Sequence, residues 1–246
     1  MTSPILTQTV AKLARGQHVT LVALGDSITE ITFHTRGHMN WVGLLAEGVF
    51  GTYGNGVCTL VNAGKCGSSY AEALTRLDRD VIRYAPDAVI IAFGMNDATQ
   101  GAAGLPDFRR QVRECVNRIR QRCGSEILIR TPNPVVTVHG VPLPKEQPRP
   151  GRPWDSLERP LGLYAAALVD LGKELDCPVV DHYTLWTTRM FTVKHPVADP
   201  TGLWPRMGDA IHPGYLGHLA FYRELAPCFC IPRYLPWEEV DEAATL

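Results

Sequence analysis

The amino-acid sequence predicts an α/β domain built on an open parallel sheet that helices cover on both faces. Three observations lead to this fold class. Short apolar runs alternate regularly with longer segments of helical spacing. The runs are apolar on both faces, as in 87–93 (DAVIIAF), which is typical of strands buried in a parallel sheet. The chain has 246 residues, of which 45% are hydrophobic and 20% charged, and these values suit one globular domain.

Each predicted strand is a short run rich in aliphatic and β-branched residues. The runs are 18–24, 57–63, 87–93, 126–130 and 178–181. Strands that alternate with helices are joined by right-handed crossovers, so their carboxyl ends meet at one edge of the sheet. We therefore expect a doubly wound central sheet of about five parallel strands.

The predicted helices carry an apolar residue every three or four positions. They span 40–50, 70–84, 106–122, 162–175 and 214–225. In the second helix, Ala71, Leu74 and Leu77 share one face, and Ser68 or Ser69 stands at the N-cap position. One helix follows each strand, which predicts a helical layer on each side of the sheet.

The whole chain, 1–246, is predicted to form a single domain with three less regular segments. Residues 1–17 suit a short amphipathic helix packed on the body of the domain. The segment 132–160 contains eight prolines and is long for a loop, so it is either a rigid surface excursion or a functional segment near the site. Residues 227–246 are expected to form an irregular C-terminal arm.

Charge and hydropathy argue against two classes of protein. The 24 Lys and Arg residues balance 25 Asp and Glu, which leaves a net charge of −1 and no basic footprint for nucleic acid. The longest uncharged apolar stretch, 88–95, is too short, because a membrane-spanning helix needs about 20 residues. Lys12 and Arg15 fall where the hydrophobic part of a signal peptide would lie, so we expect a cytoplasmic protein.

The seven cysteines are odd in number and include no CxxC pair. A zinc ribbon and a thioredoxin-like redox site therefore have no support, and Cys228-x-Cys230 is too tight for an ordinary zinc knuckle. Free thiols in apolar segments act as small hydrophobes. The cysteine pattern is that of a reduced protein.

Four small or polar segments stand where the chemistry of such a fold belongs. The first three, 25–30 (GDSITE), 62–67 (NAGKCG) and 94–97 (GMND), directly follow apolar strands, and the fourth, 209–214 (DAIHPG), opens the last helix. Open α/β sheets bind their ligands beyond the carboxyl ends of the strands. We therefore expect the functional residues among these four segments.

Taken together, the four segments resemble, in order, the four sequence blocks of the SGNH (GDSL) hydrolases, a family of esterases and acylhydrolases. GDSIT resembles the nucleophile block, NAGKCG the block with an oxyanion glycine, GMND the G-x-N-D block and DAIH the D-x-x-H block. The resemblance spans about 18–226, and Ile31 stands where the family often has glycine. It implies a flavodoxin-like three-layer α/β/α sandwich and a serine esterase that uses no metal and no organic cofactor.

The predicted catalytic residues are Ser27, His212 and Asp209. A serine hydroxyl needs a hydrogen-bonded base near neutral pH, and Ser27 lies on a strand-to-helix turn that can project it into the crevice. His212 is the candidate base, and Asp209, three residues earlier, can orient its imidazole through the Nδ1–H group. A lone Asp-x-x-His before a helix is more often a capping pair, but the other segments favour catalysis. His218 is the fallback base.

The oxyanion of acyl transfer needs preorganised hydrogen-bond donors. The candidates are the Ser27 backbone N–H, a glycine N–H of the second segment, for which the resemblance implies Gly67, and the side-chain amide of Asn96. The simpler alternatives are a tight turn at the glycine and an Asx turn at Asn96. We interpret Asp26 and Asp97 as acceptors that brace their loops.

Several residues near the four segments are candidates for contacts with a substrate, on weaker evidence. The candidates are Asp26, His34, His38, Trp41 and Trp204, with Met207 beside the last. His34 and His38 have a metal-like i, i+4 spacing, but no third ligand is evident, so a position at the rim of the pocket is favoured. Trp41 either walls the site or is a core aromatic residue at the start of a helix. Trp204 and Met207 line the pocket or only pack.

The sequence therefore predicts an esterase acting on a small substrate, with short-acyl esters such as carbohydrate O-acetyl groups favoured because no apolar lid helix is evident. A lysophospholipase or thioesterase acting on longer acyl chains is the alternative. A non-catalytic, flavodoxin-like ligand-binding protein is the rival of a different class. Such a protein would have no use for Asp209 and His212. A homo-oligomer is possible and is not decided by the sequence.

Overall fold

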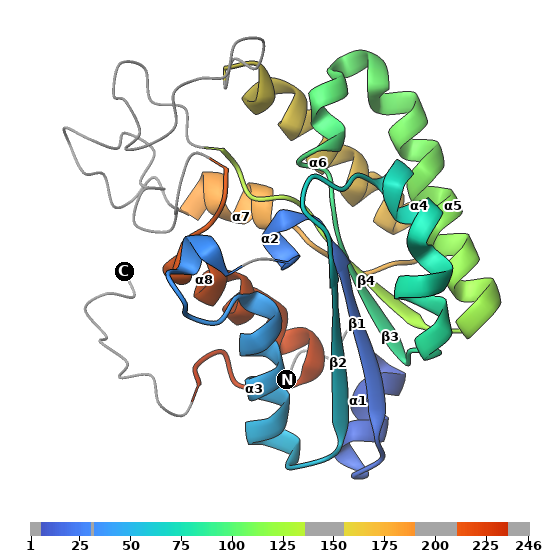
Figure 1. Ribbon diagram of the computed structural model, residues 1–246, viewed down its shortest axis with the longest axis vertical. Helices are drawn as coiled ribbons and strands as arrows, with labels where there is room; N and C mark the ends of the chain where they lie inside the picture. Colours follow the sequence, from blue (N-terminus) through green and yellow to red (C-terminus); the bar gives the residue numbers. More distant parts are fainter. Residues whose placement is uncertain (1–5, 31, 136–154, 190–210, 236–246) are drawn as a thin grey trace.

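The computed structural model describes residues 6–30, 32–135, 155–189 and 211–235. Its centre is one five-stranded parallel sheet with the strand order β2-β1-β3-β4-β5. Figure 1 labels β1 to β4 of this sheet. The strands are β1 (Val19–Gly25), β2 (Cys58–Gly64), β3 (Ala88–Ala92), β4 (Glu126–Arg130) and β5 (Val179–Val180). This order is that of the flavodoxin-like doubly wound sheets, so the predicted fold class is confirmed.

Helices cover both faces of the sheet (Figure 1). The principal helices are α3 (Trp41–Tyr53), α4 (Tyr70–Asp80), α5 (Leu105–Cys123), α6 (Asp155–Glu174) and α8 (Tyr215–Leu225). Helices α3 and α8 pack together on one side, and α4, α5 and α6 form a row on the other. The sheet between the two helical layers makes the three-layer α/β/α arrangement that the sequence predicts.

Polar side chains begin two of these helices. The Asn40 side chain accepts hydrogen bonds from the backbone N–H groups of Val42 and Gly43 at the start of α3, at 3.1 and 3.2 Å. Ser69 caps α4, and its hydroxyl oxygen accepts from the Glu72 N–H. Of the two serines considered as the N-cap, the structure therefore selects Ser69.

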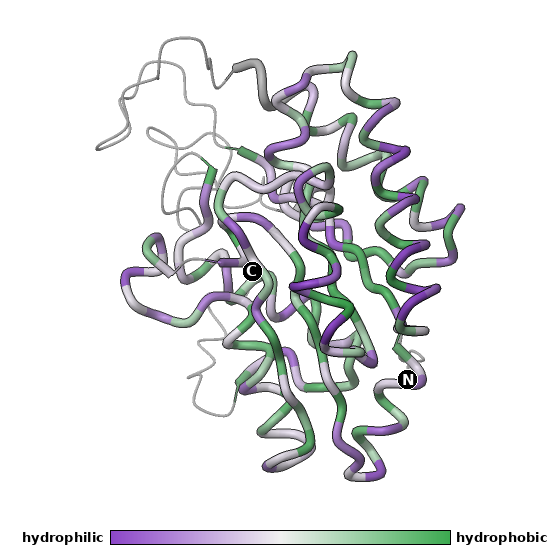
Figure 2. Tube along the Cα trace, turned by 45° about the vertical axis from the view of Figure 1, so that its right-hand side comes forward, coloured by the Kyte–Doolittle hydropathy of each residue, from purple (hydrophilic) through white to green (hydrophobic). Residues whose placement is uncertain are grey.

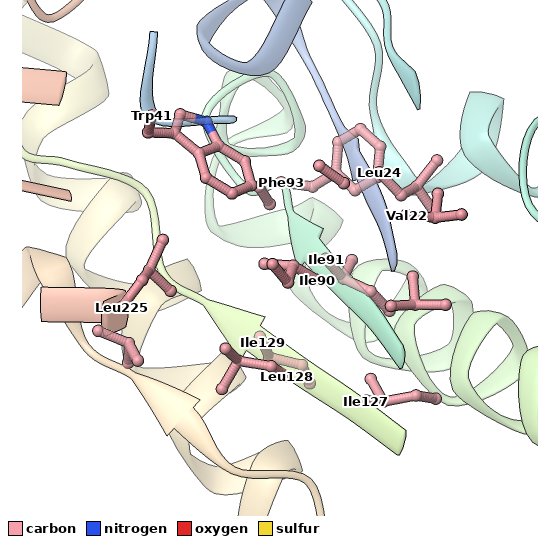
Figure 3. Close-up of a cluster of buried hydrophobic side chains, with 14 of the residues drawn as sticks. Val22, Leu24, Trp41, Ile90, Ile91, Phe93, Ile127, Leu128, Ile129 and Leu225 are labelled. Atoms are coloured by element: carbon pink, nitrogen blue, oxygen red, sulfur yellow. The ribbon is translucent and has the colours of Figure 1, made fainter. Parts of the chain in front are cut away.

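The core lies between the sheet and its helices. Every residue of β3 is buried, in agreement with a run that is apolar on both faces. Figure 3 shows side chains of β3 and β4 gathered with Trp41 and Phe93 in this core. In Figure 2, which is coloured by hydropathy, hydrophobic residues predominate in the interior strands and hydrophilic residues on the outward faces of helices.

The N-terminal segment forms the expected short helix, α1 (Thr7–Ala14), with Val10 and Leu13 on its buried face. The Glu126 carboxylate at the start of β4 accepts hydrogen bonds from two backbone N–H groups of its first turn, those of Gln8 and Thr9. These groups have no partner within the helix, so Glu126 acts as a cap supplied by a distant part of the chain.

Some boundaries differ from the prediction. Helix α6 begins at Asp155, well before the predicted start at 162, and contains Pro160. Two short helices, α2 (Ser27–Glu30) and α7 (His182–Arg189), were not predicted. A four-residue helix is too short to show a period, and α7 has little amphipathic pattern.

Two predicted irregular segments are described only in part. Residues 136–154 of the proline-rich segment and 236–246 of the C-terminal arm lie outside the described residues. Within the arm, Ala226–Phe229 form a short 3-10 helix. Across the parts of the chain that the structure describes, none of the helices is both long and apolar enough to cross a membrane.

Candidate active site

The side chains of Ser27 and His212 meet beyond the carboxyl end of β1. The Ser27 Oγ atom lies 3.0 Å from the His212 Nε2 atom, although 185 positions separate the residues. Ser27 is the first residue of α2, and His212 lies in the loop that leads into α8. Both side chains are half-buried. The structure therefore brings together the predicted nucleophile and base at hydrogen-bond distance.

Two glycines allow α2 to lie against the sheet. A Cβ atom at Gly25, the last residue of β1, would collide with the Thr29 side chain. A Cβ atom at Gly64, the last residue of β2, would collide with the backbone of Glu30. The two glycines are paired in register across β1 and β2, so together they make the space that α2 occupies.

Two asparagine side chains from different segments bind the end of α2, the helix that begins with Ser27. Asn40 at the start of α3 and Asn62 in β2 each donate a hydrogen bond from Nδ2 to the Thr29 carbonyl oxygen, both at 2.8 Å. This oxygen belongs to the last turn of a very short helix, where carbonyl groups lack helical partners. Sequence reasoning did not find these roles, because the acceptor is a backbone atom far away along the chain.

Asp26 braces the nucleophile turn from within. Its buried carboxylate accepts a hydrogen bond of 3.0 Å from the Ile28 N–H. Burial raises the pKa of Asp26 to about 6, against the opposing effect of the Arg130 guanidinium. The structure thus supports the interpretation of Asp26 as a loop brace, and the residue is only 2% exposed.

The loop before His212 is held by Asn133, which follows β4. The buried Asn133 side chain donates from Nδ2 to the Ile211 carbonyl oxygen at 3.0 Å. Asp209, the predicted partner of His212, lies outside the described residues, as do Trp204 and Met207.

The other two polar segments are joined to each other by the Asn96 side chain. Asn96 donates from Nδ2 to the Ser68 carbonyl oxygen at 3.0 Å, and its side chain is half-buried. Gly67 is exposed and has a φ of 72°, a left-handed conformation that favours glycine. Ser68 therefore links Asn96 directly to the loop that carries Gly67.

Asp97 braces these segments, as predicted. Its carboxylate accepts from the Tyr70 N–H at 2.9 Å and from the Gly94 N–H at 3.1 Å. Burial raises the pKa of Asp97 to about 6, while the two N–H donors oppose the shift. The carboxylate thus fixes the loop after β3 to the start of α4.

Arg76 on α4 is a buried residue of the site that the sequence did not indicate. Its guanidinium donates to the carbonyl oxygens of Gly25 and Ala63, at 3.0 and 2.8 Å, and thereby joins the ends of β1 and β2. It also contacts the Ser68 hydroxyl at 3.3 Å and forms an ion pair with Asp80. The only sequence signal was the i, i+4 spacing of Arg76 and Asp80, which is also typical of a solvated helix face.

The two histidines with metal-like spacing have different partners. The His34 ring stacks on the His212 ring, with centroids 4.2 Å apart and planes 2° from parallel. The exposed His38 ring stacks on Tyr215 at 4.5 Å. Within the described ranges, no three His, Cys, Asp or Glu side chains are grouped closely enough to hold a metal ion.

Trp41 and His218 lie in the core. Trp41 is fully buried, which favours the role of a core aromatic residue at the start of a helix. The His218 Nδ1 atom accepts a hydrogen bond of 3.1 Å from the Trp41 backbone N–H. Burial lowers the pKa of His218 to about 3, and Arg130 adds to this effect. His218 therefore stays neutral, and its Nδ1 atom is engaged by the Trp41 N–H, unlike the imidazole of a general base exposed to substrate.

Comparisons with known proteins agree with this fold and identify the family. The chain matches no curated protein sequence. Among solved structures, it is similar to Axe2, an acetylxylan esterase from Geobacillus stearothermophilus, with a TM-score of 0.66 and 19% identity over 89% of this chain and 97% of that one.

Two further solved structures resemble the chain. One is LAE5, an alpha/beta hydrolase from the metagenome of Lake Arreo, with a TM-score of 0.66 and 21% identity over 87% of this chain and 96% of that one. The other is a lipase/acylhydrolase from Enterococcus faecalis, with a TM-score of 0.61 and 22% identity over 84% and 93% of the two chains. These similarities establish the shared fold.

The family itself is identified from the sequence profile of the GDSL-like lipase/acylhydrolase family, which matches residues 23–220. The matched region begins in β1 and ends in α8, so it includes Ser27, Asn96 and His212. The chain therefore belongs to the GDSL-like lipase/acylhydrolase family and is an ester hydrolase of the SGNH type.

Proposed function

We propose that this protein is a serine esterase that cleaves carboxylic esters through an acyl-enzyme. The observation that carries the proposal is the 3.0 Å contact between Ser27 Oγ and His212 Nε2. A hydroxyl group is a weak nucleophile near neutral pH, and a hydrogen-bonded imidazole activates it. Ser27 also begins a helix, and Gly25 and Gly64 leave the space in which that short helix lies against the sheet.

In the proposed reaction, Ser27 Oγ attacks the ester carbonyl carbon while His212 Nε2 accepts the hydroxyl proton. The tetrahedral intermediate then collapses, the bond to the alcohol oxygen breaks, and His212 returns the proton to that oxygen. Water next attacks the acyl-enzyme with His212 as base, which releases the carboxylic acid and restores Ser27. Asp209 orients the imidazole and stabilises the imidazolium that forms in each half-reaction.

The similarity to Axe2 supports this assignment. Variants of that esterase in which a serine, an aspartate or a histidine is replaced by alanine are described as catalytic mutants. The aspartate and histidine replaced there are three positions apart, as are Asp209 and His212 in this chain. The same three residue types thus occur here with the same close spacing of acid and base.

Three donors are proposed to stabilise the oxyanion. They are the backbone N–H groups of Ser27 and Gly67 and the side-chain amide of Asn96. The Asn96 amide has two hydrogens, and its Nδ2 atom donates to the Ser68 carbonyl oxygen at 3.0 Å. We assign the second hydrogen to the oxyanion, because the bond to Ser68 fixes the orientation of the amide before substrate binds.

We propose short-acyl esters, with acetylated carbohydrates as the favoured class, as the substrates. The described part of the loop between α2 and α3 carries the exposed polar side chains of Arg36 and His38, and its His34 ring stacks on His212. Such side chains suit the hydroxyl-rich alcohol part of a sugar ester. Axe2 is named an acetylxylan esterase, which supports this class. The Enterococcus neighbour is named a lipase/acylhydrolase, and it keeps longer acyl esters as the second candidate.

Covalent labelling by a fluorophosphonate tests the proposed nucleophile. We expect one label per chain, located at Ser27 by peptide mapping, together with hydrolysis of p-nitrophenyl acetate. The variant Ser27→Ala should not be labelled, and its turnover should fall by a factor of about 10⁴ or more. Its melting temperature should stay close to that of the wild type.

The matched control is Ser125→Ala. Ser125 lies just before β4, at the opposite edge of the sheet, and its hydroxyl donates to the Pro86 carbonyl oxygen. This variant should still be labelled and should still turn over ester. Labelling at a residue other than Ser27, or full turnover in a folded Ser27→Ala variant, would contradict the proposal. No label and no ester turnover in the wild type would favour a non-catalytic binding protein.

A further inference from the structure

The imidazole rings of His34 and His212 form a parallel stack. Their centroids are 4.2 Å apart and their planes differ by 2°. The partner ring belongs to the residue whose Nε2 atom contacts Ser27 Oγ on its edge. One face of the proposed base is therefore covered by His34, while the edge of the same ring points at the proposed nucleophile.

His34 is itself held in place by its surroundings. It lies in the short 3-10 helix Phe33–Thr35, and the buried Thr35 hydroxyl is within hydrogen-bond distance of the carbonyl oxygens of Thr32 and His38, at 2.7 and 2.5 Å. The Phe33 ring contacts the His34 ring edge to face, with centroids 5.3 Å apart. The stacking ring thus belongs to a turn that the Thr35 hydroxyl braces, and it has a second aromatic neighbour in the exposed Phe33.

We propose that His34 is a positioning residue for His212, which holds the plane of the imidazole toward Ser27 and prevents both rings from being charged at once. The proposal rests on the proposed serine-esterase function. A neutral ring stacked on His212 restricts its rotation and presents a π face to the imidazolium formed during attack. A charged His34 would oppose that imidazolium at a distance of 4.2 Å.

The other titratable groups around the pair allow this effect to be isolated. His218 on α8 interacts electrostatically with both rings, but its pKa of about 3 keeps it neutral. Asp26 at the end of β1 interacts with His212, and its pKa of about 6 means that its charge changes in the same pH range. Arg130 lies behind Asp26 and His218 and keeps its charge. Asp209, the proposed partner of His212, also carries charge beside it. A comparison that changes His34 alone leaves Asp209 and these three groups in place.

The direction of the effect follows from charge. A neighbouring cation lowers the pKa of His212, because it disfavours the charged form of the imidazole. Replacing His34 by phenylalanine removes the only group at this position that can take up a proton and keeps an aromatic face, so nothing there opposes the imidazolium of His212. The variant His34→Phe should therefore raise the pKa of His212 and move the acid limb of turnover to higher pH, by about half a unit or more.

The test combines kinetics with an activity-independent measurement. The pKa of His212 is read by ¹⁵N NMR of the imidazole nitrogens in the wild type, His34→Phe and His34→Ala. Turnover of p-nitrophenyl acetate against pH is measured for the same proteins. We expect His34→Phe to keep the plateau kcat within about threefold and to raise the pKa of His212, whereas His34→Ala lowers the plateau kcat about tenfold with little change in KM.

The matched control is His18→Ala, which removes an exposed histidine next to β1, at the opposite edge of the sheet. It should leave the plateau kcat and the pKa of His212 unchanged. The proposal is overturned if the pKa of His212 in His34→Phe equals or falls below that of the wild type, or if His34→Ala keeps full turnover. Absence of esterase activity in the wild type would refute the proposed function, and the NMR titration would still decide whether the two rings are coupled.

Discussion

The Asn133 side chain donates a hydrogen bond from Nδ2 to the Ile211 carbonyl oxygen at 3.0 Å, one residue before His212. Asn133 follows β4 and is completely buried, whereas the segment it holds enters the site from the other end of the chain. The same Nδ2 atom also lies 3.0 Å from the Pro134 carbonyl oxygen. The sheet thus carries the proposed nucleophile directly and holds the proposed base through this amide.

Replacing Asn133 by alanine should therefore affect turnover more than substrate binding. We expect kcat to fall by about tenfold or more, because a small displacement of His212 weakens its alignment with Ser27. The loss of a buried hydrogen bond should also lower the free energy of unfolding by about 1–2 kcal/mol. Steady-state kinetics and urea denaturation measure the two effects. An increase in KM at unchanged kcat would contradict the positioning role.

Replacing Asn96 by alanine should lower kcat by about 10²–10³-fold with little change in KM. This pattern is expected when a donor to the oxyanion is lost, because that charge exists only in the transition state. The alternative is that the amide only ties its loop to Ser68, through the 3.0 Å hydrogen bond. In that event the variant would lose thermal stability and retain its turnover at low temperature.

The buried carboxyl group of Asp26 predicts a pH dependence of stability with a definite sign. Burial raises its pKa from 3.8 to about 6, so between these values the native state keeps a proton that the unfolded state has released. The native state is therefore stabilised by the protonated Asp26 carboxyl group below about pH 4, and this stabilisation is lost as the pH rises to about 6.

The variant Asp26→Asn removes this titration and keeps an oxygen that accepts from the Ile28 N–H. The unfolding free energy of the wild type relative to this variant should decrease by about 2 kcal/mol from pH 4 to 6.5. Urea denaturation of both proteins at several pH values measures the difference. A difference that stays constant with pH would show that Asp26 is not protonated on folding.

Asp209 is predicted from the sequence to orient His212 and to raise its pKa by its negative charge. The variant Asp209→Asn should lower turnover strongly and move the acid limb of the pH profile to lower pH. The wild-type limb is expected near pH 6–7, the ordinary range of histidine. An acid limb that is unchanged in Asp209→Asn would remove Asp209 from the proposed mechanism.

Acyl length separates the two proposed substrate classes. Acetate esters should be hydrolysed with a higher kcat/KM than octanoate esters, because the sequence shows no segment suited to a long apolar groove. A series of p-nitrophenyl esters from acetate to octanoate measures this preference, and acetylated xylooligosaccharides extend it to sugars. A maximum at long chains would leave the serine mechanism intact and favour a lysophospholipase or thioesterase.

The interior strands β1, β3 and β4 were predictable because burial on both faces leaves a continuous apolar run. The predicted run 126–130 coincides with β4, and the run 87–93 contains the whole of β3. Helix α7 was missed because its sequence lacks a clear period and its stability comes from tertiary contacts. In particular, Trp186 of α7 stacks on Phe221 of α8 with ring centroids 4.7 Å apart.

The site was predictable to the extent that its residues follow strands directly. Ser27 and Asn96 stand next to strand ends, so their proximity to a shared edge followed from topology alone. Arg76, Asn40 and Asn133 act on backbone carbonyl oxygens of segments distant in sequence. Such contacts leave no local pattern, because any helix or loop carries arginine and asparagine for ordinary reasons.

The pairing of Gly25 with Gly64 has an evolutionary consequence. The two residues are neighbours across β1 and β2, and each excludes a side chain from the space of the same four-residue helix. A larger residue at either position would displace α2 and with it Ser27. This displacement would occur even if the other position kept its glycine. Among homologues that keep a serine on such a helix, both positions should be constrained together, so a relative that loses one glycine should also show a rebuilt nucleophile turn.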